Sequence, residues 1–181
     1  VTSKNMTTIN GMMEVAGDKA GLIIANPNGI TVSGGGSINA SKLTLTTGKP
    51  DIKDDELNGF SVNGGTITLG KLDSASPTEI LSRNVVINGK VSADELNVVA
   101  GNNYVNTAGE VTGKVTATGK RNGYSVDVAK LGGMYANKIN LVSTESGVGV
   151  RNLGVIVGGE KGISIDANGQ LLNSNAQIKS E

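Results

Sequence analysis

Few side chains in this sequence could carry out chemistry. Histidine, the commonest general base, and cysteine, a strong nucleophile, are both absent from the 181 residues. Acidic residues gather only at Asp54-Asp55-Glu56 and at Asp94-Glu95, and the three arginines are scattered. A β-helical enzyme acting on polysaccharides needs carboxylates and basic residues gathered on one groove, so the sequence does not favour one. A solvated loop explains the cluster at 54–56.

No cofactor or metal site is predicted. The segment Gly158-Gly159-Glu160-Lys161-Gly162 superficially suggests a phosphate-binding loop. It lacks the Gly-Lys-Ser/Thr signature and a following helix, so we interpret it as a corner between strands. Thiolate metal ligands are absent, and calcium-binding nonapeptide repeats are absent as well.

Charge and hydropathy exclude two further classes of partner. Sixteen basic and sixteen acidic residues give a formal net charge of zero, which predicts neither nucleic-acid binding nor electrostatic capture by an anionic membrane. No run approaches the roughly 18 apolar residues of a membrane span. The chain opens on Val1 without a signal peptide or an initiator Met, so we expect it to be a piece of a longer protein.

The strongest local signal is a turn at Asn26-Pro27-Asn28-Gly29-Ile30. Pro27 presets the backbone angle that the second position of a tight turn requires, while Asn28 and Gly29 tolerate left-handed angles. An apolar run precedes this motif and an alternating run follows it. We therefore expect a buried strand to lead into a sharp turn and a half-exposed strand to leave it. The Asn side chains would bond the local backbone.

An eight-residue pattern occurs three times and indicates a solenoid. It reads apolar, x, Ala, x, x, apolar, x, apolar, and Ala is expected where an inward side chain meets a narrow corner of a stacked core. The predicted repeat core is Ile38, Ala40, Leu43 and Leu45 in the first copy, Val91, Ala93, Leu96 and Val98 in the second, and Met134, Ala136, Ile139 and Leu141 in the third.

Composition agrees with an all-β solenoid. Aromatic residues are only 2%, which suits thin layers of aliphatic side chains. The chain has 27 glycines but only 3 prolines, so its composition is not that of a disordered tract rich in both residues. Seven glycines follow asparagine, the strongest short-range turn signal. They are Gly11, Gly29, Gly59, Gly64, Gly89, Gly123 and Gly169. At about 4.8 Å per coil, one domain over 1–181 could make about seven coils, a rod on the order of 35 Å long.

Between the repeats the sequence predicts irregular segments. We expect a protruding loop over 49–59 and an exposed strand or hairpin outside the stack over 110–117. Residues 60–62 and 66–69 could form a hairpin or two faces of one coil, and 78–83 could be a short helix instead of a strand. Strand-length runs at 148–150, 153–157, 163–165 and 170–172 predict two or three further coils.

The motif Ala25-Asn26-Pro27-Asn28-Gly29-Ile30, followed by Ile38 to Gly48, resembles the secretion domain of two-partner secretion exoproteins of the filamentous haemagglutinin type. A second region, Gly132 to Gly154, looks like the late coils of that family, and the resemblance spans most of 12–157. It implies a right-handed parallel β-helix with extra-helical loops or hairpins. It also implies a non-enzymatic domain that directs export through the periplasm by an outer-membrane partner transporter and starts folding outside a Gram-negative cell. The family includes adhesins, haemolysins and contact-dependent growth-inhibition toxins.

Two departures from the family pattern shape our expectations. The family's earlier capping sheet and Asn-Pro-Asn-Leu motif have no match, so we expect a truncated secretion domain without its N-terminal cap. The Cys pair of some haemolysins and inhibition toxins is replaced by Ser33-Gly34-Gly35-Gly36, which favours the adhesin branch. Receptors on host or bacterial surfaces would contact other parts of the parent protein. The motif at 26–30 is then a transporter recognition element, a structural turn, or both. The alternative functions are a carbohydrate-active β-helix enzyme and a carbohydrate-binding module.

Overall fold

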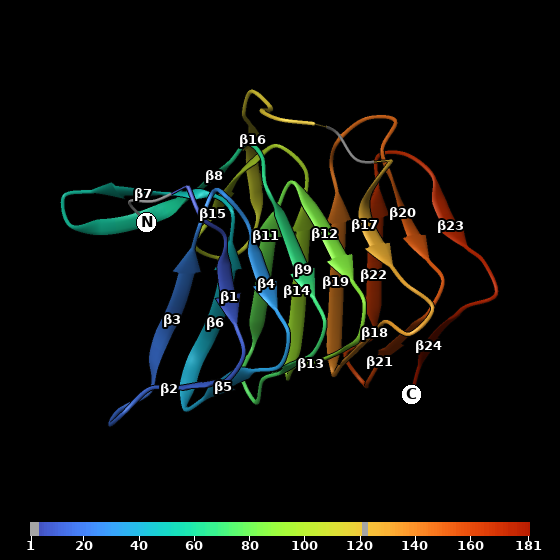
Figure 1. Ribbon diagram of the computed structural model, residues 1–181, viewed down its shortest axis with the longest axis horizontal. Coiled ribbons are helices and arrows are strands. Elements are labelled where there is room, and N and C mark those ends of the chain that lie inside the picture. Colours follow the sequence, from blue (N-terminus) through green and yellow to red (C-terminus); the bar gives the residue numbers. More distant parts are fainter. Residues whose placement is uncertain (1–3, 121–122) are drawn as a thin grey trace.

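The chain folds into a parallel β-helix, as the sequence predicted. A computed structural model describes residues 4–120 and 123–181, in which every regular element is a β-strand. Most strands pair in parallel with the strand one coil before and one coil after (Figure 1). No helix occurs in these residues, and hence none that is long and apolar enough to cross a bilayer. A right-handed winding is the hand expected of parallel crossover connections.

Three faces of parallel strands enclose the core. Face 1 contains β1 (Thr7–Ile9), β4 (Ile30–Val32), β9 (Thr66–Leu69), β12 (Asn84–Ile87), β17 (Tyr124–Val128), β20 (Gly149–Asn152) and β23 (Leu171–Asn173). Face 2 contains β2 (Met12–Glu14), β5 (Gly36–Ile38), β10 (Leu72–Asp73), β13 (Lys90–Ser92), β18 (Gly133–Ala136), β21 (Val155–Gly158) and β24 (Gln177–Ser180). Face 3 contains β3 (Ala20–Ala25), β6 (Ala40–Thr46), β11 (Thr78–Ser82), β14 (Glu95–Ala100), β19 (Lys138–Ser143) and β22 (Ile163–Ala167).

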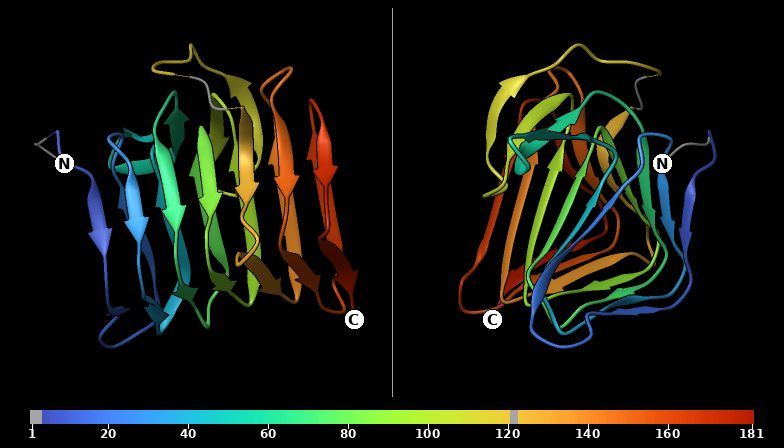
Figure 2. Two further views of the ribbon diagram at one scale, coloured as in Figure 1. Left: turned by 45° about the vertical axis from the view of Figure 1, so that its right-hand side comes forward. Right: turned by 90° about the vertical axis from the view of Figure 1, so that its left-hand side faces the viewer.

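Each coil takes one strand from every face in turn. The first coil is β1, β2 and β3, the second β4, β5 and β6, the third β9, β10 and β11, and the fourth β12, β13 and β14. The fifth is β17, β18 and β19, the sixth β20, β21 and β22, and β23 and β24 begin a seventh. Seen along the axis, the coils stack into a three-sided prism, with the chain ends at opposite ends of the stack (Figure 2).

Inward side chains form columns along the axis, because parallel pairing without slippage puts equivalent residues at the same level of every coil. One column of face 3 is Ile24, Leu45, Ile80, Val98, Leu141 and Ile165. Its four central members are fully buried. Burial of each such side chain stabilises the fold by about 1.5–3 kcal/mol. Aliphatic layers of this kind explain how so few aromatic residues suffice.

The structure places the repeat residues as follows. Leu43, Leu45, Val91, Leu96, Val98, Met134, Ile139 and Leu141 are buried in the main core, and Ala93 and Ala136 pack against it half-buried. Ala40 is buried, but it lies at the start of β6 and not at the corner that Ala93 and Ala136 occupy. The prediction of Ile38 as a core residue was wrong, since its side chain is 45% exposed.

The first repeat copy fails because the second coil carries extra residues at its corner. Gly35 pairs with Leu72, and Leu72 pairs with Val91, so Gly35 occupies the level that the ungapped alignment gave to Ile38. The small residues at the narrow corner are therefore Ser37, Ser74, Ala93, Ala136 and Gly158. The Ser37 and Ser74 hydroxyl oxygens lie 2.8 Å apart and satisfy each other inside this corner.

A four-stranded antiparallel sheet lies outside the β-helix. Its strand order is β16-β15-β8-β7, with β7 (Lys49–Lys53), β8 (Glu56–Val62), β15 (Asn103–Asn106) and β16 (Val111–Lys114). The segment 49–59 protrudes from the stack as predicted, but it is not a loop, because β7 and β8 form a hairpin that projects along the axis past β3 (Figure 1). Its turn uses Asp54 and Asp55 with φ of 53° and 62°. The exposed strand predicted over 110–117 is confirmed as β16.

This extra-helical sheet covers half of the outer surface of face 3. Phe60, Val62 and Val105 of the extra sheet form a second core with Leu81 and Val99, which point outward from β11 and β14. The outward column under the sheet contains Leu81, Val99 and Val142, whereas the outward column beside it contains the polar residues Thr44, Glu79, Asn97 and Asn140. Two separate excursions of the chain, one over 48–64 and one that starts at 101, thus meet over the third, fourth and fifth coils, where Leu81, Val99 and Val142 lie.

Of the other local predictions, some are wrong and some are confirmed. Residues 78–83 do not form a helix, since β11 is a fully buried central strand of face 3 and pairing on both sides overrides local propensity. Residues 60–62 and 66–69 neither pair as a hairpin nor share a coil, because β8 joins the extra-helical sheet. The late runs are confirmed as β20, β21, β22 and β23.

Candidate functional site

The motif at 26–30 forms the corner between β3 and β4. The Gly29 amide donates to the Asn26 carbonyl oxygen at 3.0 Å, which closes a four-residue turn with Pro27 in its second position. Gly29 has a φ of 114°, and a Cβ there would lie 3.0 Å from the Thr66 carbonyl oxygen. Only glycine fits this position. The chain then enters the core at Ile30, which is fully buried.

The Asn26 side chain uses all of its hydrogen-bonding capacity inside the protein. Its Oδ1 accepts from the backbone N and the side-chain Nδ2 of Asn28, at 3.0 and 3.1 Å. Its Nδ2 donates to the Asn5 carbonyl oxygen at 3.0 Å and to Thr7 Oγ1 at 2.8 Å. Two donors and two lone pairs are the complete inventory of an amide side chain. Asn26 therefore ties the turn to the segment that leads into β1.

Asn26 heads a column of small and polar side chains at the inner corner between faces 3 and 1. The Asn26 amide bonds the Thr46 carbonyl oxygen and the Thr47 amide bonds the Leu81 carbonyl oxygen, which sets the levels. Thr47 Oγ1 lies 3.0 Å from Ser82 Oγ and donates to the Gly64 carbonyl oxygen at 2.7 Å. From the N-terminal end the column reads Asn26, Thr47, Ser82, Ala100, Ser143 and Ala167.

Exposure divides the motif into two parts. Asn26 is 1% exposed, and Gly29 and Ile30 are buried with it, whereas Pro27 and Asn28 are exposed. The amide contacts of Asn26 to Asn5 and Thr7 have no sequence signal, because they depend on the register between the first two coils. The turn itself was predictable from Pro27 and Gly29.

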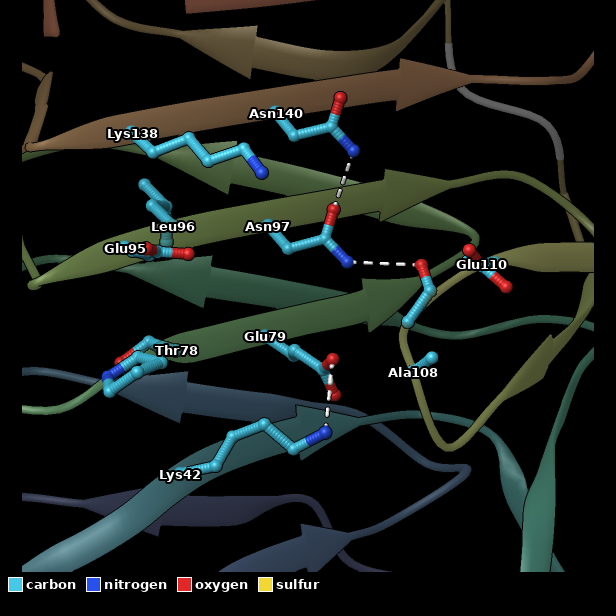
Figure 3. A pocket seen from close by; sticks show the side chains of 12 residues that line it. Lys42, Thr78, Glu79, Glu95, Leu96, Asn97, Ala108, Glu110, Lys138 and Asn140 are labelled. Carbon is cyan, nitrogen blue, oxygen red and sulfur yellow. Dashed lines mark hydrogen bonds and ion pairs between the residues drawn. The ribbon is translucent and has the colours of Figure 1, made fainter. Parts of the chain in front are cut away.

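A second candidate is a polar groove on the uncovered half of face 3. It has a volume of about 490 Å³ and lies between the outer side chains of β6, β11, β14 and β19 and the β15–β16 turn (Figure 3). Glu79, buried in its floor, accepts from Thr44 Oγ1 at 3.1 Å and pairs with Lys42 Nζ at 3.2 Å. Asn97 donates to the Gly109 carbonyl oxygen at 3.0 Å and accepts from Asn140 at 2.9 Å.

These contacts show that the polar groups of the groove hold the β15–β16 turn against face 3. Lys42 Nζ donates to the Thr107 carbonyl oxygen at 2.8 Å, and Glu95 pairs with Lys161. No aromatic side chain lines the groove for stacking on a sugar ring. The groove is therefore the place where the chain's own β15–β16 turn packs against face 3.

The residues considered for catalysis or metal binding are not brought together. Asp54, Asp55 and Glu56 are exposed at the tip of the β7–β8 hairpin, whereas Asp94 and Glu95 lie at the start of β14. Asp94 accepts from Asn137 Nδ2 at 2.8 Å. Among residues 4–120 and 123–181, no three His, Cys, Asp or Glu side chains gather closely enough to hold a metal ion. Residues 158–162 form the corner that the sequence predicted, closed by the Gly162 amide on the Gly159 carbonyl oxygen.

Comparison with known proteins agrees with the β-helix fold. A solved structure, the crystal structure of filamentous hemagglutinin secretion domain, superimposes with a TM-score of 0.85 at 31% identity, over 99% of this chain and 70% of that one. The family model for the TPS secretion domain matches residues 1–173. The fold and the family match together define a secretion domain of two-partner secretion exoproteins.

The chain belongs to the TPS secretion domain family. Similar curated proteins are a toxin CdiA of Yersinia pestis, 45% identical over 99% of this chain, and a tRNA nuclease CdiA-2 of Burkholderia pseudomallei, 44% identical over 96%. A tRNA nuclease CdiA of Escherichia coli is 40% identical over 97%. The chain spans only 5 to 6% of the length of these proteins.

Family membership fixes several broader points. Exoproteins with this domain are secreted or displayed on the surface of Gram-negative bacteria, and an outer-membrane transporter is their kind of partner. The secretion domain family is non-enzymatic. The expected adhesin branch finds no support among these relatives, which are named as toxins and nucleases. The comparisons give no support to the carbohydrate alternatives either.

Proposed function

We propose that residues 1–181 form one β-helix domain that directs a long CdiA-like exoprotein through its outer-membrane partner transporter and starts β-helix folding outside the cell. The observation that carries the proposal is the Asn26 corner, placed in the first coil of a domain shared with CdiA proteins over nearly the whole chain. Passage through the periplasm and contact with the periplasmic part of the transporter belong to this proposal. The chain itself performs no catalysis.

The burial of Asn26 indicates when the transporter would read the motif. Asn26 is 1% exposed and its amide is saturated, so a partner cannot contact it in the folded domain. Recognition that includes Asn26 must occur on the unfolded chain. Folding of the first two coils then hides Asn26 and leaves only Pro27 and Asn28 on the surface, which would release the motif from the transporter outside the cell.

Parallel pairing supports outward folding from the N-terminal coils. From the second coil on, each strand of faces 1, 2 and 3 pairs with the preceding coil, so a completed coil presents a ready template for the next. A chain that emerges progressively would add coils without waiting for distant segments. We infer that the domain nucleates the β-helix, and that the parent's toxin or adhesin activity and its surface receptors belong to other segments.

Export of the parent protein by its transporter tests the recognition role. Asn26→Ala, Asn28→Ala and Pro27→Ala would be compared with Asn88→Ala, an exposed asparagine that also precedes glycine in a later coil. Melts of the purified variants show which of them are less stable. We expect Asn28→Ala and Pro27→Ala to reduce export with little change in the melt, while Asn88→Ala exports normally. Full export of both exposed-turn variants would mean that the motif is structural only.

A binding experiment tests whether the transporter binds the motif before the domain folds. The transporter's periplasmic part would be offered the folded domain and a domain held unfolded by substitutions in the core. We expect binding to the unfolded chain alone, and Asn26→Ala should weaken it. Equal binding to the folded domain would contradict the proposal that the transporter binds the motif before folding.

A further inference from the structure

Seven asparagines precede glycine, and the structure separates one of them from the rest. In an Asn-Gly pair, the glycine amide nitrogen can attack the asparagine side-chain carbonyl carbon, because glycine has no side chain to block the approach. The attack requires a mobile backbone, a free glycine amide and an unengaged side-chain amide. Each pair can therefore be judged from its hydrogen bonds and its surroundings. Asn122-Gly123 lies partly outside the described residues.

Four of the pairs are held by hydrogen bonds or by close packing. The Gly29 amide is bonded to Asn26, and the Gly89 amide to the Leu69 carbonyl oxygen at 3.3 Å. Gly64 is fixed by Thr47 Oγ1 on its carbonyl, and Gly169 packs on the Val148 backbone, where a Cβ would lie 2.5 Å from the carbonyl oxygen. Asn168 also donates its side-chain amide to Thr144.

A fifth pair, Asn58-Gly59, lies within β8. This strand pairs with β7 on one side and with β15 on the other, and Gly59 stands opposite both Asp51 and Asn106. Its extended backbone is clamped between two neighbours. The ring closure between the side chain and the next amide cannot occur without opening the sheet.

Asn10-Gly11 has none of these restraints. Both residues are exposed in the bend between β1 and β2, and no atom lies within 4 Å of a Cβ built on Gly11. Among the hydrogen bonds of residues 4–120 and 123–181, none involves the Asn10 side chain or the Gly11 amide. The bend sits in the first coil, whose strands pair on one side only.

We propose that Asn10 is a site of spontaneous deamidation in the folded domain, with water as the co-reactant. The Gly11 nitrogen bonds to Asn10 Cγ, the Cγ–Nδ2 bond breaks, and ammonia leaves with the proton from Gly11. Water then opens the succinimide at either carbonyl. The product is an aspartyl or an isoaspartyl residue at position 10, and the latter has one extra methylene in the backbone.

The modification changes the first coil in two ways. It adds a negative charge at the bend, and the isoaspartyl form lengthens the link between β1 and β2. The Ser33 amide bonds the Ile9 carbonyl oxygen at 3.0 Å, and a Cβ on Gly35 would lie 2.4 Å from the Gly11 carbonyl oxygen. The longer link must disturb this close approach, so the pairing of β1 and β2 with the second coil loosens.

Peptide mapping by mass spectrometry tests the site. The 181-residue chain would be incubated in mildly alkaline buffer, folded and in denaturing urea, and each Asn-Gly pair followed over time. In the folded chain we expect Asn10 to lose its amide first, while Asn28, Asn63, Asn88 and Asn168 retain theirs. In urea all pairs should react alike. Equal rates at Asn10 and Asn28 in the folded chain would overturn the proposal, as would protection of Asn10 by folding.

A matched variant separates the chemistry from folding. Gly11→Ala places a Cβ in open space without a left-handed φ, so the melt should not change. The variant should slow the loss of the Asn10 amide in both states. Hydrogen exchange on the aged wild-type chain should show faster exchange in β1 and β2 and unchanged exchange in β12. Unchanged exchange in β1 and β2 would contradict the structural consequence.

Discussion

Arg83, at the end of β11, and Glu145, after β19, form a buried bidentate ion pair that reaches across the intervening fourth coil. Nε and Nη2 lie 3.0 and 2.8 Å from the two carboxylate oxygens, and the side chains are 5% and 14% exposed. Nη1 also donates to the carbonyl oxygens of Thr118 and Gly119 at 2.7 and 3.1 Å. One guanidinium thus joins the third coil, the fifth coil and the excursion between the fourth and fifth coils.

Removing either partner of this ion pair should lower the stability of the domain substantially. The hydrogen bond to Glu145 raises the pKa of Arg83 further above its usual range. Arginine stays protonated without this partner as well, so the guanidinium remains charged and buried after Glu145→Gln. We expect Arg83→Met or Glu145→Gln to lower the free energy of unfolding by about 3–5 kcal/mol, the usual cost of removing one partner of a buried ion pair. Urea unfolding measures the loss, with Glu160→Gln, an exposed glutamate, as the control. A loss equal to the control's would show that the pair is replaced by water.

Gly101 lies in the fourth coil beside Arg83, where the ion pair between Arg83 and Glu145 passes. It has a φ of 121°, and a Cβ would lie 2.3 Å from Thr144 Oγ1. We expect Gly101→Ala to destabilise the domain by about 1–3 kcal/mol through backbone strain, with the steric clash added. The comparison is Gly113→Ala, where the nearest atom lies 3.6 Å away. Equal melting temperatures for the two variants would refute this account.

The Asn26 amide should contribute measurably to stability. Asn26→Ala removes the acceptor of the Asn28 amide and the donor to the Asn5 carbonyl oxygen, and each lost hydrogen bond costs about 0.5–1.5 kcal/mol. The loss should appear as faster hydrogen exchange in β1 and β4 as well as a lower urea midpoint. Exchange that accelerates in β20 but not in β1 would place the effect elsewhere.

The second core should unfold separately from the first. Phe60 is 2% exposed and packs on Leu81 and Val99, so Phe60→Ala should cost about 3–5 kcal/mol. Because the β-helix keeps its own core, we expect proteolysis to begin in β7, β8 and β16 while faces 1 to 3 stay protected. Leu45→Ala, in the main core, should expose all parts together. Simultaneous cleavage of both regions in Phe60→Ala would contradict independent cores.

Tyr104 should titrate above its ordinary pKa of 10.0 because its hydroxyl donates to Asp51 Oδ2 at 2.6 Å, and burial adds to the same direction. A raised pKa in the folded state means that the bond contributes fully below the unfolded pKa. The contribution is lost as pH rises through the folded value. Ultraviolet titration of phenolate formation checks this, and Asp51→Asn should bring the transition closer to that of a free tyrosine. Identical curves would show that the bond is absent in solution.

Local patterns predicted the β-helix and its principal corner because each coil obeys local rules. Pro27 and Gly29 have backbone preferences that any neighbourhood must respect, and Leu43 and Leu45 alternate as a half-buried strand does. The extra-helical sheet could not be predicted in the same way. Its strands β8 and β15 are far apart in the chain and pair only because two excursions leave the same side of the stack.

The ungapped repeat failed for a related reason. Ile38 fits the pattern by sequence, yet its level in the stack depends on how many residues turn the preceding corner, and the second coil has more of them. Likewise, nothing local marks Arg83 and Glu145 as partners or Asn5 and Thr7 as contacts of Asn26. Long-range register decides these pairs.

Both excursions depart between face 3 and face 1, after Thr47 and after Ala100, whereas the strands on either side keep their inward columns in step. An added segment at this corner costs little entropy of loop closure and need not alter any level of the stack. The corner is therefore where the family can acquire new surface during evolution. Long insertions between relatives should concentrate there, while the other two corners should vary by only a few residues, as the second coil of this chain does.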